Sequence, residues 1–400
     1  MSEINLHQAD QVAFDRLCQS VPALNGMDTA AQAIGLDQNV LLHAGPPFSS
    51  VASITRPILN SACVAAVFEG LASSFDQAEA MINRREVVLK PAQDHGVVTP
   101  LAAVVSSAMS LHRIVDLANS KNQIYAPING GSGPAMRLGL RSKDVLAHIQ
   151  WINGPFAEFL TSGIKQPIEL IPIAFGALQE GDDCHGYTPA GSRHMMAEIE
   201  RNASRENMDP DIREFIDASP SLFLNVWMAA SKCMMMSASG VLGSSFVTAI
   251  AANGLEVGIQ ISGLPDRWFH SAATPPVGRF DVDLPADRAL PAIGDSAVVE
   301  GLGLGAMAIH LSPAQEKNLG RFLPQNHHHL SKALMSGNHP GFGGLNCPLG
   351  LTARAVDQYN LGPVIGLGIL DKSGEKGRLG GGIYQMPTLV FQDAISALGH

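Results

Sequence analysis

One short polar segment, GDDCHGYTPAGS at residues 181–192, concentrates groups that could do acid–base chemistry. Asp183 and His185 combine a carboxylate with an imidazole, which titrates near neutral pH and can be oriented by such a carboxylate. The segment also admits metal ligation, a nucleophile pair of Cys184 with His185, or a plain helix end with a capping aspartate. We predict that the acid–base group is His185, His95 or His43, with His185 the first candidate, and that Asp183 orients one of them.

Two further histidines are catalytic candidates because of where they lie in the sequence. His43 in LLHAGPP and His95 in QDHGVV each stand where an apolar run meets a loop rich in glycine or proline. Loops at the ends of strands are common places for ligands in α/β proteins. The alternative for each is a histidine that is structural or simply solvated.

Several cations and polar groups could bind a small anionic substrate. Lys232 interrupts the apolar run WMAASKCMMM, where an unpaired ammonium is costly to bury, so it should reach solvent or meet an anion. Arg267 beside Trp268 could clamp a planar carboxylate or phosphate, or pair with Asp266 on the surface. The predicted substrate-binding residues are Lys232, Arg267, Arg137, Asn253, Glu256 and Asp295.

The motifs of several other chemistries are missing from the sequence. The five cysteines are scattered, without the close spacing of a zinc site, and a run of consecutive histidines at 327–329 cannot share one face of a helix or strand. There is no GxxxxGK[ST], HExxH or GxSxG motif, and the GxGxxA match at 301–306 lacks a strand of useful length before it. We therefore predict no metal and no cofactor.

Composition sets the class of protein. Hydrophobic residues make up 46% of the 400, which is ample for a core and excludes a disordered chain. The net charge of −10 argues against a nucleic-acid partner held by phosphate contacts but permits small anionic substrates. The N-terminal residues show no secretory signal and no apolar run is long enough to span a membrane, so we expect a cytoplasmic protein with free thiols.

The elements that must position these residues fall into three predicted parts. Residues 1–142 form an N-terminal α/β domain, with a strand at 40–43, a helix from 57 and a strand at 86–89. Residues 143–240 form a mainly helical subdomain, and residues 241–400 a C-terminal α/β domain with a strand at 363–370. The predicted fold class is α+β or mixed α/β, and the candidate residues should meet in one cleft between the two α/β lobes.

A series of blocks, taken together and in order, resembles a known family. These blocks are LLHAGPP, HGVVTPLAAVVS, INGGSGPAMRLG, GDDCH, NVWMAASK, VTAIAANGLEVGIQISGLPDRWF and IGDSAVVEGLGLGAMA. From about residue 40 to 385 they look like the bacterial AllG/YlbE-like family. The resemblance implies two α/β parts and a small helical one. It also implies reversible carbamoyl transfer between oxalurate and phosphate, giving oxamate and carbamoyl phosphate, in the allantoin branch of purine catabolism.

We therefore expect a subunit of a carbamoyltransferase-type enzyme that acts on a small ureido or carbamoyl compound. The resemblance implies a complex with other transferase subunits, and a homo-oligomer is the other expected assembly. Such a site needs hydrogen-bond donors for a tetrahedral oxyanion, and the loops at 130–133 and 301–305 are predicted to supply them. The alternatives are a non-catalytic scaffold or substrate-binding subunit, and an amide or ureide hydrolase.

Overall fold

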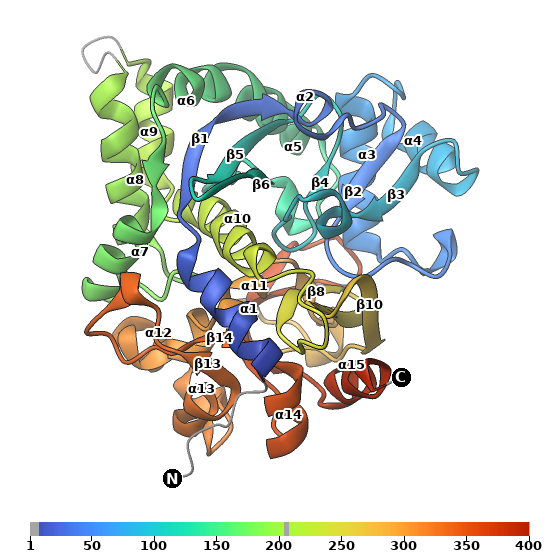
Figure 1. The fold of residues 1–400 in the computed structure, drawn as a ribbon. Helices are drawn as coiled ribbons and strands as arrows, with labels where there is room; N and C mark the ends of the chain where they lie inside the picture. The colour runs from blue at the N-terminus through green and yellow to red at the C-terminus, as the bar shows by residue number, and fades with distance from the viewer. Residues whose placement is uncertain (1–7, 204–207, 400) are drawn as a thin grey trace.

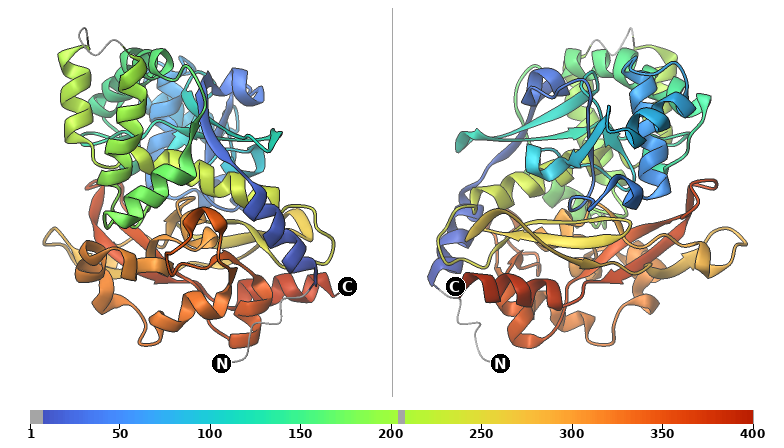
Figure 2. Two further views of the ribbon diagram at one scale, coloured as in Figure 1. Left: turned by 60° about the vertical axis from the view of Figure 1, so that its left-hand side comes forward. Right: turned by 90° about the vertical axis from the view of Figure 1, so that its right-hand side faces the viewer.

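The computed structural model describes residues 8–203 and 208–399, and two halves of the chain meet in it along one buried helix, α10 (Leu222–Ser237). Figures 1 and 2 show most of the segments before α10 above it and the segments after it below, while the N-terminal helix α1 (Gln8–Gln19) lies beside the lower half. Thirteen of its sixteen residues are buried, as expected of a helix that is apolar on all sides. It packs against β5 and β6 on one side and against α11 and β8 on the other.

The upper half contains two sheets. A four-stranded antiparallel sheet has the order β6-β5-β1-β7, and Leu24 in its middle lies opposite Ile114, which lies opposite Ile124. A three-stranded sheet has the order β3-β2-β4, with β2 and β3 parallel. The strands are β1 (Pro22–Thr29), β2 (Val40–His43), β3 (Val88–Pro91), β4 (Val104–Val105), β5 (Ser110–Asp116), β6 (Asn119–Pro127) and β7 (Ile168–Glu169).

The lower half is built from antiparallel sheets. Their orders are β10-β9-β8-β12, β11-β16-β15 and β13-β14. A tight turn joins β8 to β9, and Gly254 in it adopts a φ of 84°, a conformation that favours glycine. The strands are β8 (Val247–Asn253), β9 (Glu256–Ile261), β10 (Leu264–Ala272), β11 (Val277–Phe280), β12 (Ile293–Gly294), β13 (Met335–Gly337), β14 (Leu349–Leu351), β15 (Val364–Leu370) and β16 (Arg378–Gln385).

Local signals set the starts of several helices. Pro57 occupies the first turn of α3, the Ser142 hydroxyl accepts a hydrogen bond from Val145 N in α5, and Asp209 caps α9. The remaining helices are α1 (Gln8–Gln19), α2 (Ala30–Ile34), α3 (Arg56–Phe68), α4 (Phe75–Asn83), α5 (Lys143–Trp151), α6 (Ala157–Gly163), α7 (Leu170–Gln179), α8 (Pro189–Asn202), α9 (Pro210–Ala218), α11 (Val298–Leu302), α12 (Pro313–Leu319), α13 (His327–Leu334), α14 (Ala353–Tyr359) and α15 (Leu389–Leu398).

The α+β fold class is confirmed, and helices α5 to α10 account for most of residues 143–240. The division into three domains stays a prediction, since the largest cluster of buried apolar side chains draws members from all three parts. The consecutive histidines at 327–329 form the first turn of α13. Within 8–203 and 208–399, no helix has the length and apolar character needed to cross a bilayer.

Candidate functional site

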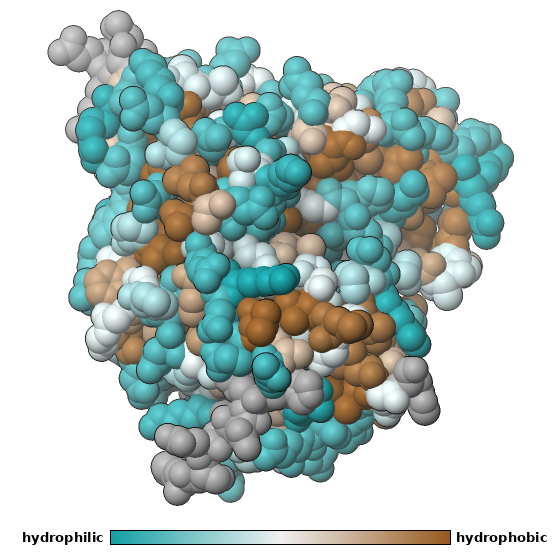
Figure 3. Space-filling model, in the orientation of Figure 1, coloured by the Kyte–Doolittle hydropathy of each residue, from teal (hydrophilic) through white to brown (hydrophobic). Residues whose placement is uncertain are grey.

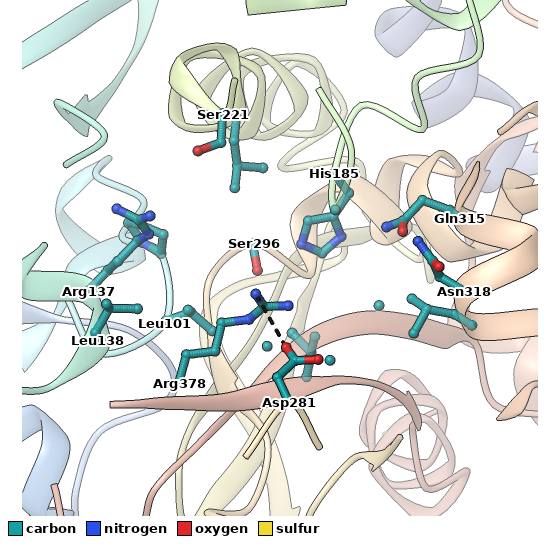
Figure 4. Close-up of a pocket in the computed structure, with 18 of the residues that line it drawn as sticks. Leu101, Arg137, Leu138, His185, Ser221, Asp281, Ser296, Gln315, Asn318 and Arg378 are labelled. Carbon is teal, nitrogen blue, oxygen red and sulfur yellow. Dashed lines mark ion pairs between the residues drawn. The ribbon is translucent and has the colours of Figure 1, made fainter. Parts of the chain in front are cut away.

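A cleft of about 290 Å³ lies where the two halves face each other. Figure 4 shows its polar side chains pointing inward from separate elements, with Arg137 and Ser221 from the upper half and Ser296, Asp281 and Arg378 from the lower half. Residues that line it are Pro100, Leu101, Arg137, Leu138, His185, Gly186, Ser221, Leu224, Arg279, Asp281, Ser296, Gln315, Asn318, Leu319, Gly366, Leu367, Gly368, Arg378 and Gly381.

The loop between α7 and α8 carries His185 into this cleft, and Asp183 holds the loop in shape. One oxygen of Asp183 accepts hydrogen bonds from the amides of His185 and Tyr187, both at 2.8 Å, and the other accepts from Gln315 at 3.2 Å. Cys184 between them adopts a φ of 60°, which is uncommon outside glycine. The prediction that Asp183 orients a catalytic imidazole is corrected here, because its carboxylate binds backbone amides rather than a ring nitrogen.

Glu300 on α11 is the carboxylate that orients His185. Nδ1 of His185 lies 2.7 Å from Oε1 of Glu300, and both side chains are buried, with 6% and 0% of their surface exposed. The same oxygen accepts hydrogen bonds from the amides of Ala306 and Gly366. This bond leaves Nε2 of His185 for a molecule in the cleft. Burial lowers the pKa of His185, but the charge and hydrogen bond of Glu300 and the charge of Asp183 together raise it above its ordinary value.

The cleft is rich in arginine. Arg279 bonds Asp281 at 2.9 Å, and Arg378 lies 3.9 Å from the same aspartate, so one carboxylate faces two guanidinium groups. Arg137, on the short 3-10 turn Met136–Leu138, donates from Nη2 to the carbonyl of Gly131, while its Nη1 is buried without a hydrogen-bond partner. Burial and the charge of Arg378 lower the pKa of Arg137 to about 10, so it remains a cation at neutral pH.

The other two candidate histidines lie away from the cleft. His43 ends β2, is fully buried, bonds the carbonyl of Ala44 through Nδ1 and packs on the Phe48 ring. Burial lowers its pKa to about 4, which keeps the ring neutral. His95 lies on the 3-10 turn Ala92–His95, and burial together with the charge of Lys90 lowers its pKa. Neither ring lines the cleft.

Three buried candidates instead connect elements behind the cleft. Lys232 donates from Nζ to the carbonyl of Thr248 at 2.8 Å, so it meets neither solvent nor an anion directly. Asp295 accepts hydrogen bonds from the amide of Gly45, from the side chain of Gln93, and from the amide and hydroxyl of Thr99. Asn253 accepts from the amides of the β8–β9 turn and donates to the loop after β2. Their positions favour structural roles.

The remaining predicted groups lie on the sheet of β8 to β10 or point away from the cleft. Arg267 stacks over the ring of Phe269 at 4.8 Å and forms no clamp with Trp268. Glu256 binds the neighbouring-strand His270 at 3.0 Å. The Cys184 thiol is buried toward the interior, and burial raises its pKa well above the usual range, so a thiolate partner for the adjacent histidine is disfavoured.

The structure therefore brings together only part of the predicted site. Of the ten candidates, His185 and Arg137 line the cleft and Asp183 lies directly behind it, whereas the expected convergence of the rest does not occur. The amides at 301, 303 and 305 bond other backbone carbonyls, so that loop does not offer the expected oxyanion donors. Across 8–203 and 208–399, no group of three or more His, Cys, Asp or Glu side chains is placed to hold a metal ion.

Sequence reasoning missed Glu300 as the partner of His185, although a usable signal was present. A single carboxylate in the apolar run AVVEGLGLGA must be paired or hydrogen-bonded once buried, by the argument that singled out Lys232. The cleft residues Arg279, Asp281 and Arg378 sit in polar segments, and no local pattern separates them from ordinary surface charges.

Comparisons with known proteins identify one family model and several similar proteins. A family model described as oxamate carbamoyltransferase subunit AllG matches residues 87–296. Two Escherichia coli K12 proteins are similar: the uncharacterized protein YahG, 30% identical over 97% of this chain and 84% of its own, and oxamate carbamoyltransferase subunit AllG, 27% identical over 98% and 97%. A crystal structure of a conserved Enterococcus faecalis V583 protein of unknown function superposes with a TM-score of 0.92, at 26% identity over 98% and 97%.

Proposed function

The chain belongs to the AllG family, and from this premise we propose that it is a subunit of a carbamoyltransferase-type enzyme acting on a small ureido or carbamoyl compound. The proposed reaction transfers a carbamoyl group between oxalurate and phosphate, giving oxamate and carbamoyl phosphate. The proposed site is the cleft between the two halves, with His185 as the acid–base group.

The pair of His185 with Glu300 is the observation that carries this proposal. A carboxylate that binds one ring nitrogen fixes the orientation of the imidazole and favours its protonated form, which leaves the second nitrogen to exchange a proton with substrate. The pair faces a cleft that also contains arginines and a serine hydroxyl. Transfer of a carbamoyl group between two small anions requires acid–base groups and anion-binding groups in one concave site.

The chemistry follows from the bonds exchanged. An oxygen of phosphate attacks the carbamoyl carbon, and the negative charge that develops on the carbonyl oxygen needs donors such as Ser296 and Arg378. The bond from that carbon to the oxamate nitrogen then breaks, and this nitrogen takes a proton. His185 in its protonated form supplies that proton from Nε2, and the neutral imidazole then takes up the proton that the transferred phosphate loses, so the proton count balances; the reverse reaction runs the same transfers backwards. Because its pKa is raised, the protonated form persists to higher pH than in an ordinary histidine.

The test is an assay of the purified chain, alone and with its family's partner subunits, on oxalurate plus phosphate. We expect the complete complex to be active and His185→Gln to lower its turnover by about 10²–10⁴, the usual contribution of a positioned acid–base group. A matched control is His194→Gln, since His194 binds Glu180 at 2.7 Å on the surface, outside the cleft. Unchanged turnover of His185→Gln would remove His185 from the mechanism, and substrate binding without turnover would favour a substrate-binding subunit.

The proposed partners are other transferase subunits, small anionic substrates and, as an alternative assembly, further copies of this chain in the cytoplasm. Figure 3 shows apolar side chains gathered on the face where α1 and the β8 sheet lie. Leu242, in the turn before β8, is 90% exposed. Exposed apolar surface of this kind supports association with another protein. Sedimentation of the chain with and without co-expressed partner subunits tests the assembly, and a monomer under both conditions would contradict it.

A further inference from the structure

We propose that Arg137 and the N-terminus of α10 form an oxyanion subsite at the upper wall of the cleft, which holds the carboxylate or phosphate group of the ligand opposite His185. This inference rests on the proposed function in so far as it concerns the same cleft. The inference goes beyond the proposed function by stating which end of the ligand lies against Arg137 and which lies against His185. Its test measures binding rather than turnover.

Arg137 is the first observation. Its Nη2 is satisfied by the Gly131 carbonyl at 2.7 Å, but its Nη1 is buried and has no hydrogen-bond partner. Within the part of the chain that the structure describes, no carboxylate forms an ion pair with it, whereas Arg279 and Arg378 face Asp281. Arg137 as a whole is only partly buried, but a buried guanidinium nitrogen without a partner is costly unless an acceptor approaches it. Arg137 therefore differs from the other two cleft arginines in having no carboxylate among the described residues that balances its charge.

The start of α10 is the second, independent observation. Ser221 at the N-cap and Leu224 in the first turn line the same cleft as Arg137, and Figure 4 shows Ser221 at the top of the cleft and Arg137 at its left. The Ser221 side chain makes no capping bond to its own helix. Sixteen residues of aligned peptide dipoles place a partial positive charge at this end, which favours a negative group close to it.

The two walls of the cleft differ in chemistry, and this orients a ligand. The upper wall offers the Nη1 of Arg137 and the helix terminus, which attract a negative charge. His185, bound to Glu300, and Gln315 lie across the cleft from Arg137, where groups that donate and accept protons suit an amide or ureido end. A small molecule with an oxyanion at one end and an amide nitrogen at the other fits this polarity, and a neutral amide lacks the group that the upper wall selects.

The experiment is calorimetric titration of the full chain with inorganic phosphate, with oxamate and with acetamide, which lacks the carboxylate. We expect at least one anion to bind and acetamide not to bind measurably. Arg137→Gln should weaken anion binding by about 10–100-fold, the usual effect of losing a hydrogen bond to a charged group. The control Arg193→Gln removes a surface arginine paired with Glu180 at 2.6 Å and should leave binding unchanged.

The anions distinguish the two sources of the charged group. If only oxamate binding falls in Arg137→Gln, the subsite takes a carboxylate; if only phosphate binding falls, it takes the phosphoryl group. Equal affinities of wild type and Arg137→Gln for both anions overturn the proposal, and so does a wild type that binds neither.

A structural readout covers the case in which Arg137→Gln does not fold. Crystals of the wild-type chain grown with phosphate or oxamate should show the anion between Nη1 of Arg137 and the first turn of α10. An anion elsewhere, or none, overturns the subsite. If anion binding depends on Arg137 but the complexes never turn over oxalurate, the subsite is retained and carbamoyl transfer is refuted. If the complexes are active but Arg137→Gln binds the anions unchanged, carbamoyl transfer is retained and the subsite is refuted.

Discussion

Replacing Glu300 by glutamine isolates the electrostatic part of the His185 site. Glutamine keeps an oxygen where Oε1 of Glu300 accepts from His185, Ala306 and Gly366, so the shape of the site is retained. The change removes a buried negative charge 2.7 Å from the imidazole. Hydrogen bonds to charged groups contribute about 1.5–3 kcal/mol against about 0.5–1.5 kcal/mol for neutral ones, so the imidazolium should lose about 1–2 kcal/mol of stabilisation.

This loss lowers the pKa of His185, because the cause that raises it in the native chain is removed. A difference of about 1.4 kcal/mol changes the ratio of protonated to neutral imidazole roughly tenfold at a given pH. The raised pKa also stabilises the fold. That stabilisation is complete below the unfolded-state value of 6.5 and disappears as the pH rises through the higher value of the folded chain. Glu300→Gln should remove it.

The assay is a nuclear magnetic resonance titration of the isolated chain, with the histidine rings labelled at Cε1. The chain has 14 histidines, so the His185 signal is assigned by its disappearance in His185→Gln. We expect its midpoint to fall in Glu300→Gln, while the signal of His194, which lies on α8 and pairs with Glu180 outside the cleft, is unaffected. Identical midpoints of His185 in the two proteins, with both folded, would refute the claim that Glu300 sets its protonation.

Three further predictions concern stability. Burial lowers the pKa of Lys232 to about 8, so in the native chain unfolding free energy should rise with pH between about 8 and 10.5. In Lys232→Met this rise should vanish. Stability at pH 7 should increase by up to about 3 kcal/mol in urea titrations, because burial lowers the pKa of Lys232 by about 2.5 and each pKa unit corresponds to about 1.36 kcal/mol. Asp371→Asn should cost about 3 kcal/mol, because it breaks the two-point pairing of a fully buried carboxylate with Arg288; an unchanged urea midpoint would contradict this. Gly305→Ala should cost about 1–3 kcal/mol and impair turnover, since its φ is 59° and a Cβ would meet the Glu300 carboxylate; wild-type stability would show that the loop rearranges freely.

Local patterns predicted many of the elements that carry the site. The apolar run ending at His43 forms β2, Pro57 opens α3, and the region from 143 to 240 is mainly helical, because periodicity and start signals act within a few residues of each other. The polar segment at 181–192 was also recognised, since charged and glycine residues between helical runs are visible without any long-range contact. The position of His43 shows the limit: a histidine at a strand end can be buried in the interior just as well as exposed to a ligand.

Composition, periodicity and the order of the motifs predict the class of protein, its mixed helix and strand content, the family resemblance and His185 as the first acid–base candidate. Which groups share a site with His185 follows only from long-range contacts in the fold. Glu300 lies 115 residues further along the chain, and Asp183, the carboxylate two residues from His185, turns instead to backbone amides. Sequence adjacency fixes which residues are near along the chain, whereas burial of apolar faces and the need to satisfy buried polar groups fix which charges meet in space. That is why Arg137 came to face the cleft while Arg267 stacks on a ring outside it.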